Sequence, residues 1–237
     1  MSETQGNEYP DKKTTRFWAA RALSAISEMR HSKKTGLLPK SEGWRNVLEH
    51  ELVEAEAADV LGEKLGLSDE ERRNLRTAAL LHDIFKRKEI ERAREAGASS
   101  FDSSAGDQAN WIKSLGYSED VVGLVQSVGH TSLEEFSRDF DTIPTVRKIM
   151  RYVDDITLGN DIVPLDKRVK YIEENPEYKD LNKRGKAIFG GRTYPEVQRE
   201  MSGRIEQEFA PKLGVLDPSA IPGFINDCIN ARIAQSE

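Results

Sequence analysis

The chain has 237 residues, of which 32% are charged and 37% hydrophobic, and its formal net charge at pH 7 is -6. This length allows a full hydrophobic core, and the mildly acidic balance argues against non-specific binding to nucleic acid. Cys228 is the only cysteine, which excludes an intrachain disulfide and a cysteine-based zinc cluster, so any metal must be held by His, Asp or Glu. The polar segment 1–13 predicts no signal peptide and no membrane span, and we therefore expect a cytoplasmic protein.

In chain order, residues 1–11 are expected to form a disordered leader and residues 12–237 a single helical domain. Apolar residues recur at helical spacing between Gly and Pro breakers, and neither an alternating strand pattern nor an internal repeat occurs. The predicted fold is therefore all-α. Helices are predicted over 14–29, 41–65, 103–115, 118–130, 131–139, 144–158, 164–174, 178–189, 194–210 and 221–235, and another begins at the capping box 68–71.

Two histidines are expected to face the interior of this helical domain. His50 lies three residues after Val47 and seven before Ala57, on the apolar stripe of the predicted helix 41–65. His82 continues the apolar stripe that contains Ala78, in the helix that begins at 68–71. Taken alone, His50 is more simply explained as a core histidine bonded to a backbone carbonyl than as a metal ligand.

His82 is followed directly by Asp83, and this pair can bind one divalent metal ion through a ring nitrogen and a carboxylate oxygen. Lys86 comes three residues after Asp83, which places its ammonium group where it can meet an anion on that metal. Arg87 adds a second positive charge. A single His-Asp dipeptide is weak evidence, so further ligands elsewhere in the chain must support it.

The predicted helix 144–158 supplies a further carboxylate. Asp154 lies four residues after Met150, close to the apolar face, whereas Asp155 is expected to point toward Arg151 and water. A carboxylate on an apolar face is costly unless it is paired or metal-bound. Asp154 is therefore the expected ligand, with a buried pair to Arg151 as the alternative. His130, at the end of the predicted helix 118–130, is another candidate for an inward position.

The order His50, His82-Asp83, Asp154 resembles the HD-domain superfamily of metal-dependent phosphohydrolases, whose pattern is His, His-Asp and Asp on a bundle of helices. The match covers residues 44–160. The resemblance implies an HD core over this range, extra helices at the N-terminus and a C-terminal helical extension over 161–237. It also implies that His50, His82, Asp83 and Asp154 hold the metal.

The segment His82 to Lys86 resembles the "HDIGK" variant of the motif, with Phe85 in place of glycine. The resemblance then gives Lys86 the role of binding the substrate phosphate, and it argues against the nucleotidase branch, which has an acidic residue there. In dinuclear branches two further histidines bind a second ion. Here Asp102 stands at the first of these positions, where it is equally explained as the cap of helix 103–115. His130 is similar to the second, as in a bacterial diadenosine-tetraphosphate hydrolase branch.

The expected activity is hydrolysis of a phosphate ester or anhydride in a nucleotide or another small phosphorylated substrate. The expected cofactor is a divalent transition metal, either one ion or two, and the ligand types suit Mn, Fe, Co, Ni or Zn alike. Asp83 or Asp154 would orient or deprotonate the attacking water. Lys86, Arg87 and Arg151 would stabilise the developing negative charge.

Two other classes of function use the same pattern of ligands. One is a non-catalytic module that senses a nucleotide and retains the metal as a structural clip. The other is a dinuclear iron oxygenase, which needs about six ligands. No membrane or nucleic-acid partner is expected, and the helix 194–210 is expected either to pack on the bundle or to form the face of a homodimer.

Overall fold

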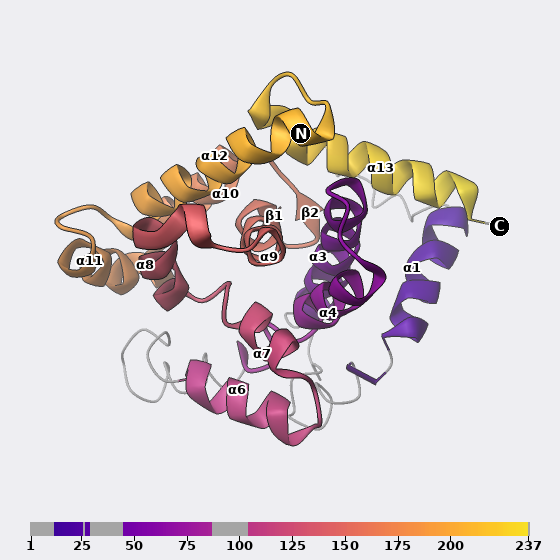
Figure 1. The fold of residues 1–237 in the computed structure, drawn as a ribbon, viewed down its shortest axis with the longest axis horizontal. Coiled ribbons are helices and arrows are strands. Elements are labelled where there is room, and N and C mark those ends of the chain that lie inside the picture. The colour runs from indigo at the N-terminus through magenta and orange to yellow at the C-terminus, as the bar shows by residue number, and fades with distance from the viewer. Residues whose placement is uncertain (1–11, 26, 29–44, 87–103, 237) are drawn as a thin grey trace, which may run out of the picture.

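The computed structural model describes residues 12–25, 27–28, 45–86 and 104–236 (Figure 1). Within these ranges the chain is mostly helical, and its strands are limited to one short antiparallel hairpin. The predicted all-α fold is therefore confirmed. The leader predicted over residues 1–11 lies outside the described residues. None of the described helices combines the length and the apolar character that crossing a membrane requires.

The α-helices are α1 (Lys12–Ser24), α3 (Arg45–Lys64), α4 (Asp69–Ala79), α6 (Ser104–Ser114), α7 (Glu119–Val125), α8 (His130–Asp139), α9 (Thr145–Ile156), α10 (Leu165–Glu174), α11 (Lys179–Ile188), α12 (Tyr194–Leu213) and α13 (Ile221–Gln235). The shorter elements are the 3₁₀ helices η2 (Phe140–Thr142), η3 (Pro176–Tyr178) and η4 (Pro218–Ala220), and the strands β1 (Thr157–Leu158) and β2 (Asp161–Ile162).

Helix α9 runs through the middle of the fold, and α3, α4, α7, α10 and α12 all pack against it (Figure 1). Most of such a helix is covered, so polar as well as apolar side chains must be accommodated inside the protein. The side chains on α9 with no solvent exposure are Ile149, Met150, Arg151, Tyr152, Val153 and Ile156.

Helices α3 and α4 form a hairpin that presents one wall of the site to α9. Gly66 closes α3 with a φ of +77°, a conformation that glycine adopts without strain. Ser68 and Glu71 form the predicted capping box at the start of α4. Small buried residues such as Ala57 and Ala78 let the two helices approach closely.

The helix that was expected to carry His82 ends at Ala79, so His82 and Asp83 lie in the tight turns that follow it. The amide groups of Ile84 and Lys86 donate to carbonyls three residues earlier, at 3.3 and 2.8 Å. Four of the six side chains over 80–85 are buried and apolar. One face of a continuous helix could not bury so many consecutive residues. The chain therefore leaves the helix axis to bury them.

Other boundaries also differ from the predictions. Helix α1 ends at Ser24, five residues before the end of the predicted helix 14–29. Helix α9 ends at Ile156 and gives way to the β1–β2 hairpin, in which Gly159 has a φ of +64°. His130 was predicted to end the helix 118–130. In the structure four non-helical residues follow α7, and His130 begins α8. Helix α12 continues past Pro211, which removes only one backbone donor, and ends where Gly214 adopts a φ of +70°.

Charged side chains fix α3 between its neighbours α4 and α13. Arg72 of α4 donates to Asp59 of α3 with two N–H groups, each at 3.1 Å. Arg232 of α13 donates to the same carboxylate at 2.7 Å and also reaches Glu56. Because α3 carries two of the site residues described below, these contacts hold one half of the site in position.

Candidate metal centre

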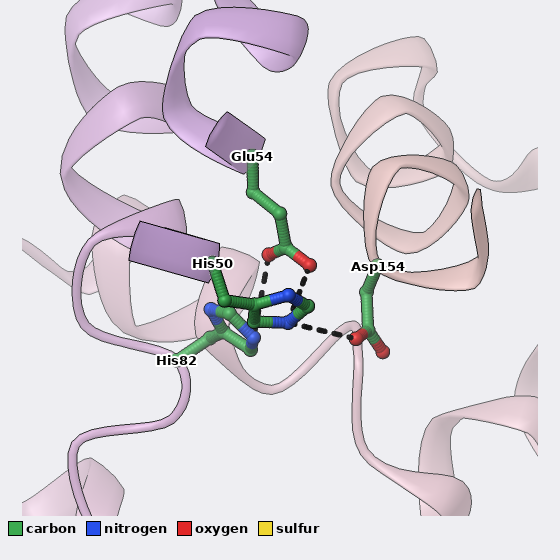
Figure 2. A group of neighbouring side chains, drawn as sticks. All are labelled: His50, Glu54, His82 and Asp154. Atoms are coloured by element: carbon green, nitrogen blue, oxygen red, sulfur yellow. Dashed lines mark ion pairs between the residues drawn. The ribbon is translucent and has the colours of Figure 1, made fainter. Parts of the chain in front are cut away.

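Four side chains from three separate parts of the chain meet beside α9. His50 and Glu54 come from α3, His82 from the turns after α4, and Asp154 from the last turn of α9 (Figure 2). One potential ligand atom of each lies within 4.8 Å of those of the other three. The structure therefore brings together three of the residues that the sequence singled out, and adds Glu54 to them.

Glu54 lies between the two imidazoles. Its Oε1 is 2.8 Å from Nε2 of His50, and its Oε2 is 3.3 Å from Nε2 of His82. The carboxylate is completely buried. Sequence reasoning missed this residue, although a signal was present: Glu54 follows His50 by four positions, which places both on one face of a helix.

Backbone carbonyls orient both rings. Nδ1 of His50 is 2.7 Å from the carbonyl oxygen of Gly159 in the β1–β2 hairpin, and Nδ1 of His82 is 2.8 Å from that of Ala79 at the end of α4. A carbonyl oxygen only accepts, so each Nδ1 carries a proton and donates it. In the neutral ring the lone pair is then on Nε2, which faces the cluster. This is how histidine ligands of metals are usually held.

Several atoms at the centre of the cluster are buried without a hydrogen-bond partner. They are Oε2 of Glu54 and Nε2 of His82, 3.3 Å apart, and, when the ring of His50 is neutral, Oε1 of Glu54 as well. Buried polar atoms are rarely left unpaired, because each costs on the order of 1–3 kcal/mol. A cation between these atoms would satisfy all of them. The donor set of two imidazole nitrogens and two carboxylate oxygens fits a divalent transition metal but does not select one.

The electrostatics of the cluster support the same conclusion. Burial lowers the pKa of His50, but the carboxylate of Glu54 and the charges of Asp83 and Asp154 outweigh burial and raise this pKa to about 9. The ring attracts a proton because several carboxylates surround it. A divalent ion would supply that positive charge instead, and binding it would release the proton.

Asp83 lies at the edge of this group, next to Lys86. Its Oδ2 is 3.9 Å from Nε2 of His82, and its Oδ1 is 3.5 Å from Nζ of Lys86. Burial raises the pKa of Asp83, but the positive charges of Lys86 and the two histidines hold it well below its usual range. Asp83 is therefore ionised, with Lys86 as its nearest cation.

The two adjacent aspartates of α9 have the partners that the sequence predicted, with Asp154 in the cluster and Asp155 on Arg151, but their exposure differs from the prediction. Asp154 keeps 23% of its side chain exposed, and its Oδ1 lies 4.0 Å from Nε2 of His50. Asp155 was expected to point partly toward water, but it is buried and accepts hydrogen bonds from Arg151 at 2.9 Å and Ser202 at 2.5 Å. The side of α9 that the sequence assigned to solvent is covered by α12.

Arg151 was expected to contact substrate, and the structure places it in the interior instead. Its guanidinium group is fully buried and donates to Asp155, to the hydroxyl of Tyr194 and to the carbonyl of Val128. These contacts join α9 to α12 and to the segment before α8. Arg151 is thus part of a buried hydrogen-bond network that holds the central helix.

The remaining candidates fall outside the described part of the structure. Arg87 and Asp102 lie in the range 87–103, which the structure does not describe, and of His130 only the backbone at the start of α8 is described. The prediction of a second metal ion therefore stays a prediction.

The described residues thus contain a buried His/Glu/His/Asp cluster in an all-helical chain, with donors suited to a divalent cation. Comparison with protein-family models, curated proteins and solved structures finds no match to this chain.

Proposed function

We propose that this protein is a metal-dependent phosphohydrolase that acts on a nucleotide or another small phosphorylated substrate. One observation carries the proposal: two imidazoles held through Nδ1 present Nε2 to the same point as the buried Glu54 carboxylate, whose Oε2 has no hydrogen-bond partner. The order His50, His82-Asp83, Asp154, which resembles the HD-domain superfamily, adds support.

The carboxylate side of the site is where water and substrate would enter. The side chains of Asp154 and Asp83 keep 23% and 21% exposure, whereas those of His82 and Glu54 keep 2% and none. A metal held here would have ligands on its buried side and open positions toward solvent. Open positions of this kind distinguish a catalytic metal site from a closed structural one.

In this proposal each residue has a defined role. His50 and His82 would bind the ion through Nε2, and Glu54 and Asp154 through oxygen. The bound ion would lower the pKa of water and neutralise charge on phosphoryl oxygens. Asp83 would accept a hydrogen bond from the attacking water and so orient it, and its low pKa suits it to accepting hydrogen bonds more than to storing a proton. Lys86 would donate to a phosphoryl oxygen.

The burial of most of the potential metal ligands also favours a second candidate function, in which the metal is structural. Because His50, Glu54 and His82 are almost inaccessible, the ion would serve equally well as a clip that joins α3 to the turns after α4. Such a protein would bind metal and gain stability from it without turning over any substrate. A dinuclear oxygenase has less support, since the group in the described residues offers four donors.

Metal-dependent turnover separates these candidates. The purified protein is loaded with Mn²⁺ or Co²⁺ and offered phosphomonoesters, cyclic nucleotides and dinucleotides. We expect hydrolysis that disappears on metal removal and in His82→Ala, falls at least tenfold in Asp83→Asn, and persists in the control Asp161→Asn, an exposed hairpin residue. Stoichiometric metal binding without turnover of any of these substrates would reject the hydrolase and support the clip.

A further inference from the structure

Arg168 on α10 is a cation without a partner. Its Nε is shielded from solvent and makes no hydrogen bond. No hydrogen bond or ion pair of its guanidinium group occurs anywhere in the described ranges, and the group lies over the ring of Tyr171, 5.8 Å from the ring centroid. A half-buried arginine normally pairs with a carboxylate, so this side chain is free to take an anion.

The positive charge of Arg168 interacts with carboxylates of the candidate metal centre. Helix α10 packs against α9, which carries Asp154. Burial lowers the pKa of Arg168, but Asp154 and, in decreasing order, Tyr178, Asp155 and Glu54 raise it above its usual value. In turn Arg168 is among the charges that lower the pKa of Asp83. The guanidinium group therefore lies within electrostatic range of three carboxylates of the site without forming an ion pair with any of them.

A divalent ion would add positive charge to the site. Asp83 is ionised beside Lys86, and Arg168 supplies a second positive charge near it. With the two charges of the metal added to those of Lys86 and Arg168, the site would attract an anion.

We propose that Arg168 is an anion-binding residue of this site and contacts the phosphoryl group of the substrate. The assignment rests on the proposed function and deepens it, since it names a residue that sequence reasoning did not identify. The planar guanidinium group offers two parallel N–H donors, which match two oxygens of a phosphoryl group. Lys86 in the turns after α4 would supply a second cation from a different element.

Inorganic phosphate tests this proposal without requiring turnover. Its affinity for the Mn²⁺-loaded protein is measured by calorimetry for the wild type, Arg168→Ala, Arg168→Lys and the control Arg199→Ala. Arg199 is a matched control because it also contacts α10, through Asp166 and Glu173, but on the surface. Circular dichroism and the affinity for Mn²⁺ are recorded for each protein.

We expect Arg168→Ala to weaken phosphate binding tenfold or more with unchanged Mn²⁺ affinity, Arg168→Lys to recover part of the loss, and Arg199→Ala to behave as the wild type. If wild type and Arg168→Ala bind phosphate equally, if the metal-loaded wild type binds none, or if Arg168→Ala loses its metal or its fold, the assignment is overturned. Phosphate binding that depends on Arg168 without any hydrolysis would reject only the proposed function.

Discussion

Glu54 and His82 face each other across the site with Oε2 and Nε2 3.3 Å apart, and neither atom has a hydrogen-bond partner. Two buried polar atoms at this distance, with no hydrogen bond between them, are placed so that one cation can bind to both. Figure 2 shows the same convergence for His50 and Asp154. The predictions below begin from this relationship.

Glu54→Gln tests whether the carboxylate is a ligand. The substitution keeps the shape of the side chain but removes the charge, so we expect Mn²⁺ affinity to fall about 10–100-fold. Isothermal calorimetry measures it. Glu63→Gln on the same helix is the control, because the Glu63 side chain is 45% exposed and pairs with Arg232. Equal losses in the two variants would exclude a specific role for Glu54.

Metal binding should stabilise the fold, because the site is assembled only in the native state. At a free ion concentration 100 times the dissociation constant, the gain is about 2.7 kcal/mol. For a protein of this size it corresponds to a rise in melting temperature of roughly 5–10 °C. We expect this rise in the wild type, its reversal by a chelator, and its absence in His82→Ala. A similar rise in His82→Ala would place the bound metal elsewhere.

Gln108 should act on the site without touching the metal. Its side-chain amide donates to the carbonyls of Leu81 and His82, at 3.1 and 2.5 Å, and so supports the turn that presents His82. Gln108→Leu removes these donors, and we expect metal affinity to fall about tenfold. Gln126→Leu, at an exposed position, is the matched control. Unchanged affinity in Gln108→Leu would show that the turn holds its shape without this support.

The buried pair Arg151–Asp155 predicts a large loss of stability. Arg151→Met leaves the buried carboxyl group of Asp155 without its cation, and we expect a loss of about 3–5 kcal/mol in the free energy of unfolding. Arg199→Met, which breaks exposed ion pairs, should cost no more than about 1 kcal/mol. Urea unfolding measures both. A loss in Arg151→Met as small as that in Arg199→Met would contradict the buried network.

Glu206 predicts a stability that falls as the pH rises. Its carboxylate accepts from the hydroxyl of Tyr152 at 2.9 Å, and burial raises its pKa to about 7 from an ordinary value of 4.5. Between these two values the folded state binds more protons than the unfolded state, so the free energy of unfolding decreases with increasing pH. The expected loss is on the order of 2 kcal/mol.

Glu206→Gln should remove this dependence, because the amide cannot ionise but still accepts from Tyr152. We expect the variant to be more stable than the wild type at pH 8 and similar to it near pH 5. The difference between the two proteins isolates Glu206 from the histidines, which also titrate. Glu200→Gln, an exposed change on the same helix, should leave the pH profile as it is. Parallel profiles for the wild type and Glu206→Gln would disprove the prediction.

The all-α fold and most helix positions could be predicted because capping residues, breakers and apolar spacing act locally. Ser68 and Glu71 form their capping box without help from the rest of the chain. The helix boundaries that differ depend on distant partners. The turns over 80–85 form because their side chains are buried by other elements, and Gln108 of α6 stabilises the carbonyls of this segment.

The same distinction holds for the site. Periodicity alone indicates that His50 faces inward, because helical spacing fixes the direction of a side chain relative to its neighbours on the same helix. His82 is also buried, but it lies in the turns after α4, where helical spacing does not fix its direction. Periodicity does not tell which side of an enclosed helix meets which neighbour. Asp154 and Asp155 are adjacent, yet one reaches the cluster and the other pairs with Arg151.

The sequence by itself therefore determined the fold class, the helical frame and the order of the His and Asp residues. Only the tertiary structure decided that Glu54 joins the cluster, that Arg151 belongs to the interior and that Arg168 is left without a partner. The physical reason is that local spacing sets the face on which a side chain lies. Its charge partners are set by the packing of helices that are far apart in the chain.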